Sequence, residues 1–179
     1  MSLAVKKYAN ALLEIAVEEN CLDEVYGQFK LFNGELCENA QLEKLLVMDI
    51  IPSTEKRAIL KDFLAECNPL FANFINIIID KDREDELKLM YLEFNELYKQ
   101  EKNIIEATAV TAIELSEAEV EDMKNKLAEK YNKTVILENK IDESILGGIV
   151  LYLGDSVIDA SLRGKLDGLR NTMKQIKLS

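Results

Sequence analysis

The stretch LENKIDESILGGIVLYLGDSVIDASLRGKL, residues 137–166, carries four of the seven glycines in this 179-residue chain. Two short β-rich runs, 148–153 and 156–160, are separated by Gly154 and Asp155. A Gly-Asp pair between such runs is typical of a tight hairpin. The stretch therefore predicts strands joined by turns, followed by a capped helix. The expected turn and cap residues are Gly147, Gly148, Gly154, Asp155, Asp159 and Ser161.

The same glycines do not form a phosphate-binding motif. A P-loop reads GxxxxGK[ST], and a dinucleotide-binding turn reads GxGxxG between a strand and a helix. Neither pattern occurs in the chain, and the G-x-S-x-G nucleophile elbow is also missing. Gly147 and Gly148 precede a strand, where backbone N–H groups are not directed at a phosphate as they are at a helix start. Turn formation is the favoured interpretation.

Composition excludes several function classes. The chain has no histidine, so catalysis by a Ser-His or Cys-His pair is excluded and the commonest transition-metal ligand is missing. Its net charge of −11 disfavours nucleic-acid binding, which needs a positive field. Three cysteines without a CxxC pattern fit unpaired thiols. No apolar run approaches the roughly 20 residues of a membrane span, and the start lacks a signal-peptide pattern. A cytoplasmic location is expected.

Residues 1–103 predict a bundle of about six helices, because apolar residues recur at helical spacing and no segment keeps a period of two. Asn68–Pro69 and Pro52–Ser53 interrupt the pattern and restart it. The expected helices are 3–20, 22–40, 41–48, 53–67, 70–82 and 83–103.

Residues 104–179 predict a small α/β or α+β domain of a few strands and two helices. Segment 104–115 alternates and is rich in Ile, Val and Thr, which is typical of a strand. Ser116 and Glu119 form an S-x-x-E capping box for a helix that ends near residue 132. Strands are expected at 133–141, 148–153 and 156–160. A final amphipathic helix has Leu162, Leu166, Leu169, Met173 and Ile176 on one face.

Two helices of the bundle are more apolar than one packed face requires. The apolar positions of 3–20 cover about 240° of the helix circumference, and those of 70–79 cover about 180°, whereas a stripe somewhat over 100° is enough. Deep burial would explain either helix alone. Both together favour an exposed groove that binds a helical partner.

The carboxylates form no persuasive catalytic pair or metal site. Segment 80–86, DKDREDE, has alternating acids but lacks the glycine and the length of a calcium-binding loop. Acids such as Glu14, Glu18 and Glu93 lie near lysines at helical spacing, as on a solvated face. We expect no metal and no cofactor.

The stretch of residues 137–166 resembles the ATP synthase delta subunit family, known in mitochondria as the oligomycin sensitivity-conferring protein. Residues 135–166 are similar to its C-terminal signature, and Tyr8–Ala9 is similar to a Tyr-Ala pair in its first helix. Tyr152 departs from the pattern, since the family usually carries a charged or polar residue there. The matching positions are Val135, Leu137, Ile141, Asp142, Ile145, Gly147, Gly148, Leu151, Gly154, Asp155, Val157, Ile158, Asp159, Ser161 and Leu166.

The resemblance implies a non-catalytic stator subunit of a proton- or sodium-translocating ATP synthase. Domain 1–103 would bind N-terminal helical segments of the alpha subunits on the catalytic head, and domain 104–179 would bind the b subunits of the peripheral stalk. Contact with the membrane would be indirect, through the complex, on the cytoplasmic face of a bacterial cell membrane. The groove would lie between the first and fifth helices. Its implied residues are Tyr8, Ala11, Leu12, Ile15, Phe74, Ile77 and Ile78.

Two other functions stay open from the sequence. A helical adaptor or RNA-binding regulator fits a small helical bundle, although the acidic N-terminal half speaks against RNA. A small enzyme would have to use carboxylates, for which Asp142, Asp155 and Asp159 are the candidates.

Overall fold

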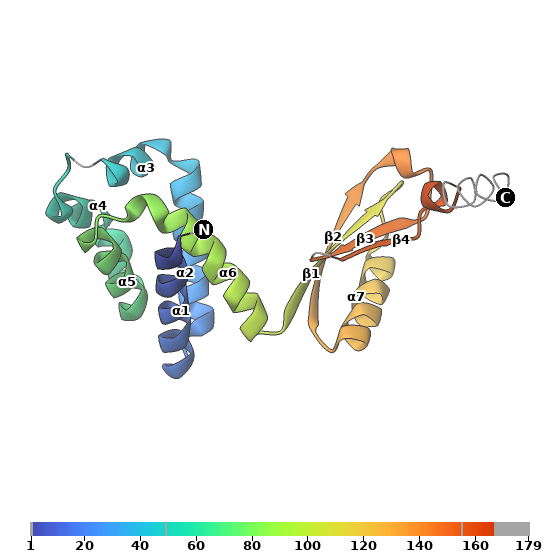
Figure 1. The fold of residues 1–179 in the computed structure, drawn as a ribbon, viewed down its shortest axis with the longest axis horizontal. Coiled ribbons are helices and arrows are strands. Elements are labelled where there is room, and N and C mark those ends of the chain that lie inside the picture. Colours follow the sequence, from blue (N-terminus) through green and yellow to red (C-terminus); the bar gives the residue numbers. More distant parts are fainter. Residues whose placement is uncertain (1, 49, 155, 167–179) are drawn as a thin grey trace, which may run out of the picture. The chain divides into compact units, whose positions relative to one another are not determined.

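The computed structural model describes residues 2–48, 50–154 and 156–166. The chain divides into two compact units, Met1–Glu101 and Lys102–Ser179 (Figure 1). We call them unit 1 and unit 2 and describe each by itself. The prediction of a mainly helical fold with a small α/β part is confirmed.

Unit 1 is built from helices whose first turns are capped by residues visible in the sequence. Asn68 accepts a hydrogen bond from the Leu70 N–H, and Pro69 occupies the first position of the next helix, where its missing N–H costs nothing. Asn39 likewise accepts from the backbone of the two residues Gln41 and Leu42. The helices are α1 (Leu3–Glu18), α2 (Leu22–Glu38), α3 (Ala40–Val47), α4 (Ser53–Ala65), α5 (Pro69–Asp80), the 3₁₀ turn η1 (Glu84–Glu86) and α6 (Leu87–Glu101).

The core of unit 1 is centred on Phe29 of α2, which is fully buried. Its ring lies 5.4 Å from that of Phe71 and 5.6 Å from that of Phe74, both on α5. It also contacts Tyr91 and Phe94 of α6, at centroid distances of 5.4 and 5.7 Å. Tilted and edge-on aromatic contacts of this kind add to the stabilisation from apolar burial. This cluster joins α2, α5 and α6 into one core.

The start of α6 differs from the sequence prediction, which began that helix at residue 83. Asp82 has a left-handed backbone, and η1 precedes α6. The Glu84 carboxylate of η1 lies 2.8 Å from the Lys56 ammonium of α4, and the two side chains are 4% and 3% exposed. This buried ion pair joins segments 28 residues apart in the sequence.

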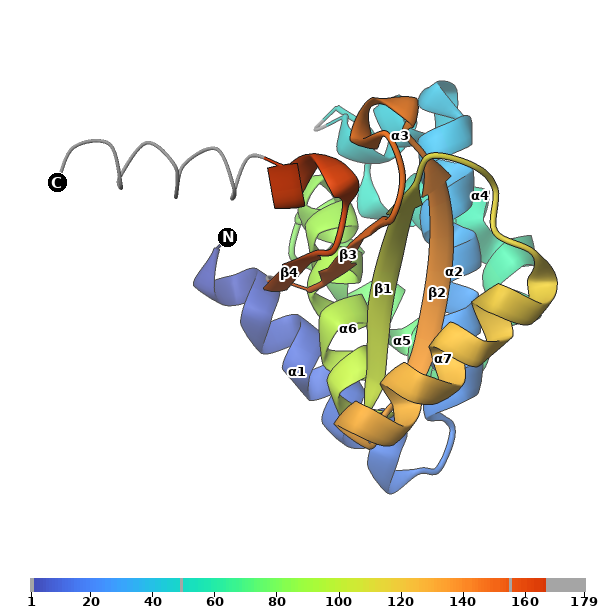
Figure 2. The ribbon, with the colours of Figure 1, turned by 90° about the vertical axis from the view of Figure 1, so that its right-hand side faces the viewer.

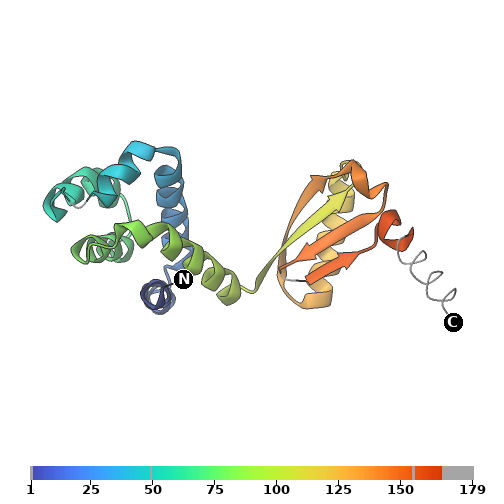
Figure 3. The ribbon, with the colours of Figure 1, turned by 45° about the horizontal axis from the view of Figure 1, so that its top comes forward.

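Unit 2 is a four-stranded sheet in the order β2-β1-β3-β4 with α7 (Glu117–Tyr131) on one face (Figure 2). Strands β1 (Ile104–Thr111) and β2 (Thr134–Ile141) are parallel, so the chain between them must cross over, and α7 supplies the crossover. Strands β3 (Ile149–Leu153) and β4 (Ser156–Asp159) are antiparallel to their neighbours. A 3₁₀ turn, η2 (Glu143–Ile145), follows β2. Leu127 of α7 is buried against the sheet. Figure 3 shows the strands side by side.

Local hydrogen bonds set where several helices and strands of unit 2 begin and end. The Ser116 hydroxyl accepts from the Glu119 N–H, and the Glu119 carboxylate accepts from the Ser116 N–H, which is the predicted capping box. The strand predicted over 104–115 stops at Thr111, because the Thr111 hydroxyl donates to the Ile113 carbonyl and turns the chain. Residues 162–166 are helical. Asp155 and the expected helix positions Leu169, Met173 and Ile176 lie outside the described residues.

Candidate protein-docking surface

Helix α1 has an apolar stripe beside the one that it buries. Its buried residues are Val5, Ala9, Leu12 and Ala16. At 3.6 residues per turn, Tyr8, Ala11 and Ile15 fall on the adjoining stripe. Ile15 is 41% exposed, Ala11 is exposed, and Tyr8 is half-buried against the core. This second stripe is accessible to a partner.

Helix α5 shows the same arrangement. It buries Phe71, Phe74, Ile75, Ile78 and Ile79 in the core. Ile77 is 39% exposed, and Leu70 is half-buried. Leu70, Phe74 and Ile77 are spaced four and three residues apart, so they share one helix edge. Helices α1 and α5 are in contact, and each has exposed apolar residues. We call Tyr8, Ala11, Ile15, Leu70 and Ile77 together the α1–α5 surface.

Burial divides the predicted contact residues into a buried and an exposed group. Leu12 and Ile78 are 2% and 0% exposed, and Phe74 is 7% exposed. Their side chains fill the core of unit 1 and support the α1–α5 surface from beneath. The sequence could not separate these residues from their exposed neighbours, because all of them lie within the same wide apolar arc. The binding role of the predicted residues, buried and exposed, stays a prediction.

Charged and polar residues border the apolar stripes. By the same helical spacing, Lys7, Glu14 and Glu18 adjoin Ala11 on α1, and Asn73 and Asp80 adjoin Ile77 on α5. All five are exposed. An apolar centre with a polar rim is the usual composition of a protein–protein interface. The arrangement is suited to binding a protein partner.

Three glycines in residues 137–166 are needed for the backbone conformation at their positions. Gly147, Gly148 and Gly154 have φ angles of +142°, +79° and +54°. A Cβ atom on Gly148 would lie 2.6 Å from the Ala160 carbonyl oxygen, which is closer than real Cβ contacts. The close approach arises because the Ala160 N–H donates to the Ile149 carbonyl across this turn. These glycines allow backbone conformations that other residues rarely adopt.

Asp142 and Asp159, in the same residues 137–166, cap turns. The Asp159 carboxylate accepts from the Ser161 N–H at 2.8 Å, and the Ser161 hydroxyl accepts from the Gly164 N–H at 3.0 Å. Asp142 accepts from the Ser144 N–H at 2.9 Å. Hydrogen bonds from Ser161 and Ser144 lower the pKa values of Asp159 and Asp142 respectively. A carboxylate stabilised in its charged form is a poor general acid, so neither residue fits that role.

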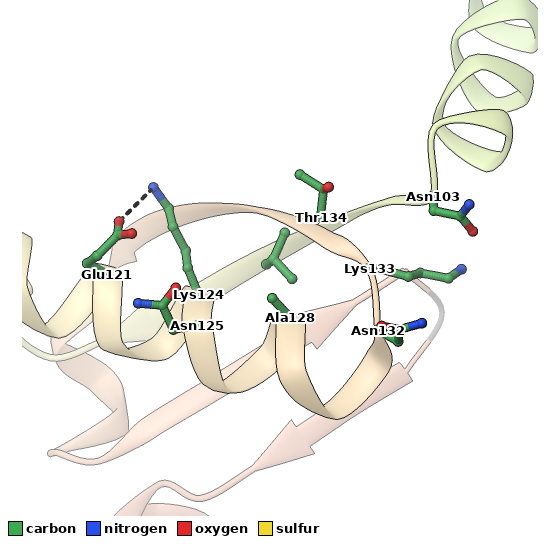
Figure 4. A pocket seen from close by; sticks show the side chains of 9 residues that line it. Asn103, Glu121, Lys124, Asn125, Ala128, Asn132, Lys133 and Thr134 are labelled. Carbon is green, nitrogen blue, oxygen red and sulfur yellow. Dashed lines mark ion pairs between the residues drawn. The ribbon is translucent and has the colours of Figure 1, made fainter.

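A cavity of about 500 Å³ lies in unit 2, where α7 ends and strands β1 and β2 begin (Figure 4). Its lining is mainly polar, and Glu121 and Lys124 form an ion pair of 3.9 Å at one side. The Thr134 N–H donates to the Asn103 carbonyl, and Asn132 ends α7 in a left-handed conformation. Asn103 and Asn132 therefore have backbone roles at this end of unit 2. The lining residues are Asn103, Glu121, Lys124, Asn125, Ala128, Asn132, Lys133, Thr134 and Val135.

The described residues lack two features, a metal-binding cluster and a membrane-spanning helix. Residues 2–48, 50–154 and 156–166 contain no group of three or more acids, cysteines or histidines that could hold a metal ion. The same residues contain no helix that is both long and apolar enough to span a membrane.

Comparison with known proteins gives the family. The family model described as ATP synthase delta (OSCP) subunit matches residues 4–173. The chain belongs to this family. ATP synthase subunit delta of Lactobacillus johnsonii is 36% identical over 93% of this chain and 92% of its own length. The subunit of the same name from Clostridioides difficile is 29% identical over 98% of both chains.

A solved structure gives the same fold. A chain of the mitochondrial ATP synthase hexamer of Toxoplasma gondii aligns with a TM-score of 0.73 over 97% of this chain and 98% of its own, at 21% identity. The predicted resemblance is confirmed, and so is the prediction that the chain is not an enzyme, because the family is a structural, non-catalytic subunit.

Proposed function

We propose that the chain is the stator subunit of a proton- or sodium-translocating ATP synthase. It links the alpha subunits of the catalytic head to the b subunits of the peripheral stalk, so that the torque of the rotor drives ATP synthesis or hydrolysis. It acts at the cytoplasmic face of a bacterial membrane and reaches the membrane only through the complex. Membership of the delta family supports this role.

The α1–α5 surface is the observation that carries the proposal. A static connector must resist torque without chemistry, and a helix bound along an apolar groove supplies an extended contact of this kind. Ile15 and Ile77 are about two-fifths exposed on helices that already fill a complete core. We assign domain 1–103 to the N-terminal segments of the alpha subunits and domain 104–179 to the b subunits. The net charge of −11 argues against the RNA-binding alternative.

Titration calorimetry of the intact chain with the N-terminal peptide of the alpha subunit from the same organism tests the proposal. Ile77→Asp and Tyr8→Asp place a carboxylate in the apolar contact, and we expect each to weaken binding about tenfold or more. Ile59→Asp on α4 is the matched control, since Ile59 is 45% exposed and lies outside the α1–α5 surface. Circular dichroism shows whether each variant is folded.

The proposal requires that the control binds as the wild-type chain does. Equal binding by Ile77→Asp, Tyr8→Asp and the wild type would refute the α1–α5 assignment. An absence of binding by the wild type, in the presence of the complete catalytic head as well as the peptide, would refute the stator role.

A further inference from the structure

Strand β2 is an edge strand of the sheet in unit 2. The order β2-β1-β3-β4 gives it a hydrogen-bonded neighbour on one side only among the described residues (Figure 2). It is eight residues long and pairs with β1 over its whole length without a bulge, whereas β4, at the opposite edge, has four residues. Proteins usually shorten, bulge or cover such edges, because their free backbone groups can pair with another strand. We call the outer side of β2 the β2 edge.

Two hydrogen bonds determine which backbone groups of β2 point outward. At its start, the Thr134 N–H donates to the Asn103 carbonyl at 2.9 Å. Just past its end, the Asp142 N–H donates to the Thr111 carbonyl at 2.8 Å. The register between the two strands is constant, so every second residue of β2 bonds to β1 and the residues between them direct their N–H and C=O groups away from it. The outward residues are Val135, Leu137, Asn139 and Ile141.

The β2 edge is accessible near both of its ends. Ile141, the last residue of the strand, is 57% exposed. Lys133, Thr134 and Val135, at its start, line the cavity of about 500 Å³ beside α7 (Figure 4). Helix α7 therefore leaves a hollow next to the first residues of the strand, into which a further chain can be laid.

The charges of β2 select the strand that fits beside it. Glu138 and Lys140 are two residues apart, so they lie on the same face of the sheet, and both side chains are more than half exposed. A complementary strand would place a base opposite Glu138 and an acid opposite Lys140. In antiparallel pairing, a step forward along one strand is a step back along the other. Strand β2 of a second copy therefore meets both requirements when the two Asn139 residues lie opposite each other.

The same register also satisfies the backbone. Asn139 lies opposite its counterpart, and Leu137 lies opposite Ile141 on either side, so each of these pairs joins two outward residues that can exchange N–H···O=C bonds. Sliding one strand by a single residue would bring residues of different faces opposite each other. Sliding it by two would place Glu138 opposite Glu138, or Lys140 opposite Lys140, and like charges directly opposite destabilise a strand pair. Charge and hydrogen bonding therefore favour one register.

We propose that the β2 edge binds a second copy of this chain through antiparallel pairing of the two β2 strands about Asn139. The two four-stranded sheets become one continuous sheet, and the Glu138 and Lys140 side chains of both copies form a group of alternating charge on one face. This inference goes beyond the proposed stator role and does not depend on it, because it concerns an association of the chain with itself.

Sedimentation equilibrium of the full chain, from about 10 µM to about 1 mM, tests the proposal, and we expect a reversible dimer. Lys140→Glu places two acids opposite each other, and Glu138→Lys places two bases opposite each other, so each should weaken the dimer about tenfold or more. The double variant Glu138→Lys/Lys140→Glu exchanges the charges and should dimerise as the wild type does. An equimolar mixture of the two single variants should form a mixed dimer, because the acids of one copy then lie opposite the bases of the other.

Two further variants separate the edge from general effects of charge and folding. Lys126→Glu is the matched charge reversal on α7, where the lysine side chain is 72% exposed, and it should dimerise within about twofold of the wild type. Ile141→Pro removes an outward N–H and leaves the bonds to β1 in place, which an edge strand tolerates, and it should weaken the dimer about tenfold or more. Circular dichroism shows whether each variant is folded.

Three results would overturn the inference. The first is a wild-type chain that stays monomeric at the highest concentration; slow hydrogen exchange of its Asn139 and Ile141 amides would then assign the β2 edge to another segment of the same chain, such as residues 167–179. The second is a dimer that Lys140→Glu and Glu138→Lys leave unchanged, which would place the contact on another surface. The third is a double variant as weak as the single variants, which would exclude the register. None of these results bears on the stator role, which binding of the alpha peptide tests separately.

Discussion

Removing one partner of the buried Lys56–Glu84 ion pair should destabilise unit 1 more than any surface change. The nitrogen and oxygen lie 2.8 Å apart, and both side chains are at least 96% buried, since 3% and 4% are exposed. Lys56→Met leaves the Glu84 carboxylate buried without its counter-ion, which costs about 3–5 kcal/mol. With a urea m-value of about 1.5 kcal/mol/M, the unfolding midpoint should fall by about 2–3 M.

The assay is urea unfolding followed by far-ultraviolet circular dichroism. Most helices of the described residues belong to unit 1, so the helical signal reports mainly on that unit. The double variant Lys56→Met/Glu84→Met should recover most of the loss, because well-packed apolar residues can replace a buried pair at little cost. Lys88→Met is the control. Lys88 pairs with Glu43 at 2.7 Å, but these side chains are 35% and 42% exposed, and the midpoint should barely move.

This prediction fails if Lys56→Met unfolds at the wild-type midpoint, since burying a carboxylate without a partner carries a large free-energy cost near pH 7. It also fails if the double variant is as unstable as the single one. That result would assign the loss to the packing of the lysine chain and not to the unpaired charge.

Gly148→Ala and acidification test unit 2, and Gly34→Ala in unit 1 is the control for the glycine substitution. Gly148→Ala should lower its unfolding free energy by about 1–3 kcal/mol, because φ is +79° and the new methyl group meets the Ala160 carbonyl, and thermal melting would show this. Gly34→Ala on α2, where the added atom meets nothing within 4 Å, should leave the unfolding free energy of the chain equal or slightly higher. Acid should destabilise unit 2. Folding lowers the pKa values of Asp142 and Asp159. The stability that these carboxylates add is therefore present above their unfolded pKa of about 3.9 and is lost as the pH falls through their folded pKa values. Urea midpoints that do not fall between about pH 5 and pH 2 would contradict this.

Short-range chemistry made much of the fold readable from the sequence. Asn68–Pro69 and the Ser116–Glu119 box start their helices through contacts within three residues, so no knowledge of the rest of the chain is needed. The Gly154 turn is equally local, because Leu153 and Ser156 face each other across two residues. These rules gave the helices of unit 1 and the strands of unit 2 to within a few residues, apart from the two 3₁₀ turns and the early end of β1.

The sequence alone determined that the chain has two over-wide apolar helices and a glycine-rich signature, and these identified the family and the region of the α1–α5 surface. The tertiary structure decided which side chains are accessible: Leu12 and Ile78 turn into the core, while Ile15 and Ile77 remain exposed. It also decided that β3 pairs with β1, which aligns Tyr152 with Thr108 and Val157. Helical spacing fixes the direction of a side chain around its own axis, but burial depends on which distant element packs there. The sequence therefore located the region of the α1–α5 surface, and long-range packing selected the residues that are exposed on it.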